Sequence, residues 1–134
     1  MRNQKFICSG FTLPELLLTA AILSYSLSMI LATFVGGVAL NETSRNLTTA
    51  NSHAQFVLED IRSATFAGIA ASISGNTWTW NTATVTSKGL NALNSESITT
   101  TSSGSNPLDI TVTVNWNDLH GRSRSHVLRT YVSG

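Results

Sequence analysis

The segment FTLPELLLTAAILSYSLSMILATFVGGVAL, residues 11–40, is the most informative part of this chain for its fold. From Leu16 to Leu40 no side chain is charged, and these 25 residues would extend roughly 37 Å as a helix at about 1.5 Å per residue. The hydrocarbon core of a bilayer is roughly 30 Å thick, so the segment can cross it. Arg2 and Lys5 precede it, with no acid among the first ten residues, which predicts a cytoplasmic N-terminus.

Two ordinary kinds of segment share part of this pattern. A secretory signal peptide would be cut after the apolar run, but the run is long for one and Glu15 stands at its head. Its best small-residue cleavage site, Val35-Gly36-Gly37, is weak. A plain signal anchor accounts for the span but leaves Gly10-Phe11 and Glu15 unexplained.

GFTLPELLLTAAIL, residues 10–23, resembles the cleavage motif of type IV prepilins and of type II secretion pseudopilins. The resemblance implies a leader over residues 1–10, which a prepilin peptidase would cut between Gly10 and Phe11. It also implies that Phe11 becomes an N-methylated N-terminus. Residues 11–40 would then be a transmembrane and filament-core helix, and residues 41–134 a periplasmic or extracellular domain.

Glu15 follows Phe11 by four residues, a spacing that places two residues on the same face of a helix. An isolated charge is costly in lipid or in a filament core. The family resemblance implies that Glu15 pairs with the N-terminal amine of a neighbouring subunit. The simpler interpretation is a first-turn acid that favours the helix N-terminus. Pro14 is expected in the first helical turn, where its missing N–H does no harm.

The rest of the chain is polar, and only 11% of all residues are charged, about half the usual share. The formal net charge is +1, which gives no support to general nucleic-acid binding. Cys8 is the single cysteine and lies in the leader, so no internal disulfide can form. The domain after residue 40 is therefore expected to hold together by packing alone.

An amphipathic pattern continues the first helix, which we expect from about residue 12 to about 66. Apolar residues recur at three- and four-residue spacing, at Leu47, Ala50, Ala54, Val57, Leu58, Ile61 and Ala64. This stripe is expected to lie on a small antiparallel sheet, so the predicted fold class is α+β and pilin-like. Residues 68–75 are predicted to be a loop because two glycines bound them.

Strands are predicted from alternating residues in the second half of the chain. The first covers residues 77–86, with Trp78 and Trp80 on one face. Residues 87–107 are ambiguous, with a short strand at 97–101 and a turn at SSGSNP, residues 102–107. The clearest strand covers 108–116, NDLHGR at 117–122 turns the chain, and a last strand covers 126–132. The natural arrangement of the last two is an antiparallel hairpin.

ITVTVNWNDLHGRSRSHVLRTYV, residues 110–132, resembles the C-terminal hairpin of PilV-like minor pilins. The resemblance implies a structural subunit, a minor pilin of a type IV pilus. The alternative is a minor pseudopilin of a type II secretion system. The implied partners are prepilin peptidase, other pilin subunits, the pilus assembly platform and, before assembly, the inner membrane. The final location would be an extracellular pilus or a periplasmic pseudopilus.

Catalytic and metal-binding patterns are not found in the sequence. His53, His120 and His126 match no metal motif and are predicted to be surface or turn residues. No nucleophile elbow or phosphate-binding loop occurs, so we expect no enzyme, no cofactor and no metal.

DNA capture by a competence pilus is a further alternative. Arg122, Arg124 and Arg129 could contact phosphates, and Trp116 and Tyr131 could stack on bases. The simpler interpretation makes Trp116 part of the core and the three arginines solvated edge residues.

Overall fold

The computed structural model describes residues 11–134, which form two units, the described residues up to Leu40 and Asn41–Gly134. Helix α1, Leu13–Ser63, contributes to both units and has 51 residues. This confirms the predicted long helix, although it ends three residues earlier than expected because the chain turns at Ser63 and Ala64. Within residues 11–40 every side chain is exposed.

In the second unit, α1 packs one stripe of side chains on a sheet. Its buried residues recur at helical spacing, which is why one face of the otherwise polar second half of α1 meets the core. They are Ala50, His53, Ala54, Val57, Leu58 and Ile61. Most of the predicted apolar stripe is thus confirmed, whereas Leu47 is 46% exposed. The structure is α+β, with an N-terminal helix on an antiparallel sheet, which is a pilin-like architecture.

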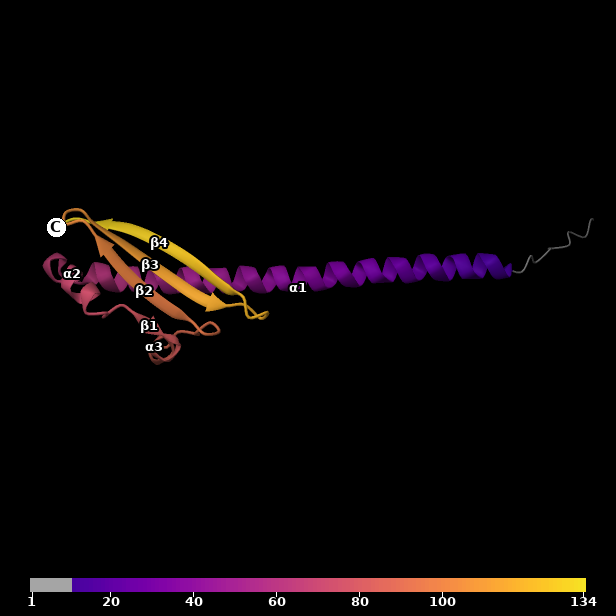
Figure 1. Cartoon of the computed structure of the whole chain (residues 1–134), viewed down its shortest axis with the longest axis horizontal. Helices are drawn as coiled ribbons and strands as arrows, with labels where there is room; N and C mark the ends of the chain where they lie inside the picture. Colours follow the sequence, from indigo (N-terminus) through magenta and orange to yellow (C-terminus); the bar gives the residue numbers. More distant parts are fainter. Residues whose placement is uncertain (1–10) are drawn as a thin grey trace, which may run out of the picture. The chain divides into compact units, whose positions relative to one another are not determined.

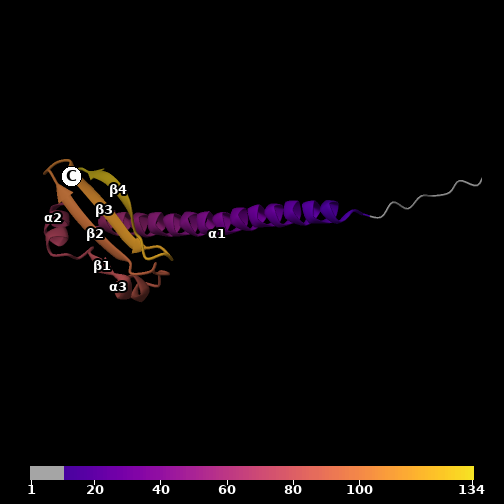
Figure 2. The ribbon, with the colours of Figure 1, turned by 45° about the vertical axis from the view of Figure 1, so that its right-hand side comes forward.

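The sheet has four strands in the order β1-β2-β3-β4, all antiparallel. They are β1 at Trp80–Asn81, β2 at Ser97–Ser103, β3 at Leu108–Asn117 and β4 at Ser123–Val132. In both Figure 1 and Figure 2, β4 forms one edge of the sheet, and β1 with α3 lies at the other.

The terminal hairpin is the best-predicted part of the sheet. Alternate residues of β3, from Leu108 to Trp116, are buried, as their period of two requires. The turn at 117–122 is confirmed, and Gly121 supplies a φ of 73°, which residues with a side chain rarely adopt. β4 begins at Ser123 rather than at His126, because Asn117 to Asn115 of β3 pair with Ser123 to Ser125.

Residues 68–75, predicted to be a loop, lie mostly in helix α2, Phe66–Ser74. Ile69 and Ile73 are four residues apart and both are buried, so one face of α2 joins the core. The burial of these two isoleucines explains why the segment is helical despite Gly68. The glycine at position 75 ends the helix, where its backbone N–H donates to Ala71 O.

The predicted strand over residues 77–86 is also wrong for most of its length. Only Trp80 and Asn81 are extended, and helix α3, Thr82–Ser87, follows directly. Asn81 caps this helix, since its side-chain oxygen accepts a hydrogen bond from Thr84 N at 2.9 Å. Trp78 and Trp80 are nevertheless both buried, at 5% and 3% exposure. Both tryptophans therefore belong to the core, although they do not stand on one long strand.

Residues 87–107, where the sequence pattern was ambiguous, contain β2 and the turn into β3. The predicted strand at 97–101 is confirmed and extends to Ser103. The predicted turn at SSGSNP is confirmed over 104–107, where Gly104 has a φ of 81°.

Candidate functional site

The predicted processing site lies at the N-terminal end of α1. Phe11 and Thr12 precede the helix, and Thr12 O accepts hydrogen bonds from the backbone N–H groups of Glu15 and Leu16 at 3.1 Å each. Pro14 lies in the first turn, as predicted. Gly10, the residue before the expected cut, lies outside the described residues.

Phe11 and Glu15 do not lie on the same face of a helix, contrary to the expectation from their spacing. α1 begins at Leu13, so Phe11 lies outside the helix and the two residues are not one helical turn apart. The Phe11 side chain is 74% exposed. Glu15 is in the first helical turn, where its charge favours the helix N-terminus. Within residues 11–134 the Glu15 carboxylate has no ion-pair partner.

The apolar part of α1 can cross a membrane by its length and composition. Its polar groups are also compatible with lipid, because the Ser and Thr hydroxyls donate to carbonyls of the preceding turn. Thr19, Ser24, Ser26, Ser28 and Thr33 all make such bonds, at 2.8 to 2.9 Å. Each side chain thus satisfies its hydroxyl within the helix, and none needs water or a neighbouring helix for this purpose.

The three hairpin arginines do not form one cluster. Arg122 and Arg124 both lie against Asp118, with Nε to Oδ2 distances of 2.8 and 3.4 Å. Arg129 pairs with Asp109 near the other end of β4. The Asp109 carboxylate raises the pKa of the Arg129 guanidinium above its ordinary value. Each of the three cations therefore has a carboxylate partner within its own domain.

Asp118 organises the turn between β3 and β4. Its Oδ1 accepts hydrogen bonds from the backbone N–H groups of His120 and Arg122, each at 2.9 Å. The hydrogen bond from the Arg122 amide lowers the pKa of Asp118 from 3.8 to about 2. Partial burial opposes this shift, and hydrogen bonds from the Arg122 side chain and the His120 amide add to it. The arrangement therefore favours an ionised Asp118 that holds the turn.

The two aromatic residues proposed for base stacking differ in exposure. Trp116 is 4% exposed and belongs to the core, as the simpler interpretation expected. Tyr131 is 66% exposed. A base could therefore reach Tyr131 but not the ring of Trp116.

A buried polar pair, which the sequence pattern did not indicate, joins α1 to the segment before β2. His53 Nδ1 lies 2.7 Å from Glu96 Oε1, and Glu96 Oε2 accepts a hydrogen bond from Leu93 N at 2.7 Å. His53 is 3% exposed and Glu96 is 2% exposed. The prediction that His53 is a surface or turn residue is therefore wrong. Its spacing, three residues after Ala50 and four before Val57, places it on the buried face of the helix and was the available signal.

The other two histidines are not brought together with His53. His120 is exposed in the hairpin turn, as predicted, and His126 is half-buried on β4 with Nε2 3.2 Å from Asn51 Oδ1. In residues 11–134 no group of three or more His, Cys, Asp or Glu side chains could hold a metal ion.

Comparisons of the chain with protein-family models, with curated proteins and with solved structures found no match.

Proposed function

We propose that this chain is a structural subunit of a type IV pilus-like filament, with the role of a minor pilin and no enzymatic activity. The observation that carries the proposal is the start of α1. There, an acid without a described partner precedes an apolar segment that is exposed throughout, and the same helix continues into a pilin-like domain. Gly10 and Phe11 stand where the prepilin motif places the cut.

The proposed sequence of events begins in the inner membrane. Residues 11–40 span the bilayer with the N-terminus in the cytoplasm, and prepilin peptidase cuts between Gly10 and Phe11. Phe11 is N-methylated, and the assembly platform moves the subunit into the filament. In the filament, Glu15 pairs with the Phe11 amine of a neighbouring subunit. Removing one member of a buried ion pair costs about 3–5 kcal/mol, so this pair would favour one register of assembly.

The first test is the intact mass and N-terminal sequence of the chain from its native membrane or filament fraction. We expect a chain that begins at N-methyl-Phe11 when prepilin peptidase is present and an uncut chain when it is absent. A chain that begins near Asn41 would identify a secretory signal peptide. A chain that stays uncut both with and without prepilin peptidase would identify a signal anchor. Either of these two results would contradict the proposal.

Glu15→Ala then tests assembly. We expect normal membrane insertion and a loss of the subunit from filaments, because the amine of a neighbouring Phe11 would be left without a partner. Glu42→Ala is the matched control, an acid of the same helix within the Asn41–Gly134 unit. Recovery of the subunit from sheared extracellular fibres is expected for a pilin, whereas a periplasmic filament would identify the pseudopilin alternative.

A further inference from the structure

The outer edge of β4 is open. Within the described part of the chain β4 pairs only with β3, so the N–H and C=O groups of its other edge have no strand beside them. β4 has ten residues, which is long for an edge strand, whereas the opposite edge is the two-residue β1. A long open edge is a template for pairing with another extended chain.

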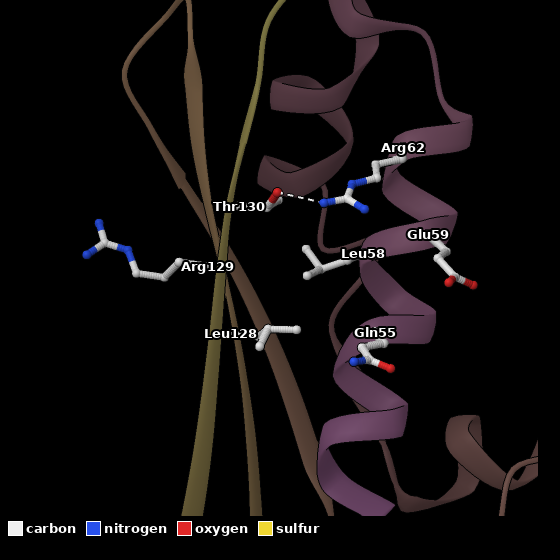
Figure 3. Close-up of a pocket in the computed structure, with 7 residues that line it drawn as sticks. All are labelled: Gln55, Leu58, Glu59, Arg62, Leu128, Arg129 and Thr130. Atoms are coloured by element: carbon white, nitrogen blue, oxygen red, sulfur yellow. Dashed lines mark hydrogen bonds between the residues drawn. The ribbon is translucent and has the colours of Figure 1, made fainter.

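A groove of about 450 Å³ runs between this strand and α1 (Figure 3). Leu58 of α1 and Leu128 of β4 point toward one another and form its apolar floor. Arg62 closes one end and donates a hydrogen bond from its guanidinium to Thr130 Oγ1 at 2.9 Å. The side chains of Glu59 and Arg129 point away from this space in Figure 3.

Arg62 differs from the hairpin arginines in its partners. Arg122, Arg124 and Arg129 each lie within ion-pair distance of a carboxylate, and among residues 11–134 no carboxylate lies that close to Arg62. A guanidinium has five N–H donors, and Thr130 takes only one of those of Arg62. The end of the groove therefore presents a positive charge with free donors, which suits a carboxylate.

The two faces of β4 next to its open edge are also suited to an added strand. Leu128 and Thr130 face α1, and Val127 and Tyr131 stand on the opposite face with 49% and 66% exposure. Side chains of a neighbouring strand alternate in the same way. One set would therefore meet Leu128 and Arg62, and the other set would meet Val127 and Tyr131.

We propose that the outer edge of β4 is a docking site for an extended peptide segment of a partner protein, which pairs with β4 as an additional strand and places a carboxylate against Arg62. Main-chain hydrogen bonds would supply affinity, and the groove would supply the preference for an acidic residue. The site lies wholly within residues 41–134, so it does not depend on the proposed filament role.

The test uses the full chain in detergent micelles and synthetic peptides of the length of β4. The first peptide alternates Val and Thr and carries one Glu, the second has Gln at that position, and the third is the Glu peptide with alternate amides N-methylated. We expect the Glu peptide to slow hydrogen exchange of the β4 amides, and the N-methylated peptide to have no effect. We expect the Glu peptide to bind about three- to fivefold more tightly than the Gln peptide, the range of an exposed ion pair.

Arg62→Gln should remove the preference for Glu and leave the tryptophan fluorescence of the core unchanged. Arg45→Gln is the matched control, since Arg45 is exposed on the same helix and does not line the groove. Failure of both the Glu and Gln peptides to protect β4, or equal affinity for the two, would overturn the proposal. So would protection of β4 that grows with the concentration of the chain alone, because the occupant would then be a second copy.

Discussion

At the scale of single residues, the most consequential contact is the buried pair of His53 and Glu96. The Glu96 carboxylate contacts both the buried His53 Nδ1 and the half-buried Leu93 amide, and it joins α1 to a segment 43 residues later in the chain. A buried donor that loses its acceptor costs about 1–3 kcal/mol. The pair therefore links α1 to the segment before β2. Replacing either partner with a hydrophobic residue would break this contact.

We expect Glu96→Ala to lower the free energy of unfolding by about 2–5 kcal/mol, because His53 Nδ1 and the Leu93 amide both lose their hydrogen-bond partner. The measurement is denaturant unfolding followed by the fluorescence of the buried tryptophans. Glu59→Ala is the control, since Glu59 is exposed on α1, and we expect a change within about 0.5 kcal/mol. Equal stability of the two variants would show that the buried pair contributes nothing.

The lowered pKa of Asp118 predicts that the stability of the folded domain depends on pH. Its folded pKa of about 2 lies below the ordinary 3.8, so the ionised carboxylate stabilises the folded domain above pH 3.8. This stabilisation is lost as the pH falls through about 2. We expect the side-chain carboxyl resonance of Asp118 to titrate with a midpoint near 2, as measured by nuclear magnetic resonance.

The matched variant is Asp118→Asn, which cannot ionise. The stability difference between the native chain and this variant should be constant above pH 4 and should shrink as the pH approaches 2. A carboxyl midpoint near 4, or a stability difference that does not change with pH, would contradict the role of the turn amides.

At the scale of elements, α1 is continuous through the glycine pair at 36–37. A Cβ added at either glycine would have no heavy atom of residues 11–134 within 4 Å, so no contact in the described part of the chain requires glycine there. Glycine within a helix costs about 0.8–1.0 kcal/mol relative to alanine. The pair is therefore the intrinsically weakest point of the apolar half of α1, although the helix does not break.

We expect Gly36→Ala and Gly37→Ala each to slow amide hydrogen exchange in residues 36–40 about fivefold in micelles, since each stabilises the helix by about 1 kcal/mol. Ala32→Gly is the reverse control and should speed exchange locally. Unchanged or faster exchange in the alanine variants would mean that the glycines do not weaken the helix.

At the scale of the whole molecule, the two units serve different proposed tasks. The described residues up to Leu40 carry the groups of the proposed processing and assembly, namely Phe11, Glu15 and an exposed apolar surface. The Asn41–Gly134 unit carries its own core, in which all three tryptophans are buried. Cys8 is the single cysteine and lies outside this unit, so packing rather than a disulfide holds the domain together. Loss of processing and loss of β4 docking should therefore be separable by variants in different units.

The features that depend on local pattern could be predicted from the amino-acid sequence alone. The absence of charged residues specifies the apolar first half of α1. The apolar stripe in its second half specifies the face that packs on the sheet. Strict alternation in residues 108–116 specifies β3 and its hairpin. These features were predictable because each depends on residues that are neighbours in the chain.

Contacts between residues far apart in the sequence are set by the fold of the whole domain and could not be predicted. Burial of Ile69 and Ile73 made α2 from a stretch with loop composition, and the Asn81 cap ended β1 after two residues. Contacts across the fold also paired His53 with Glu96 and left Arg62 beside the open edge of β4. Such contacts have no local signature, because the free energy that selects them comes from burial and hydrogen bonding between segments that only the completed fold brings together.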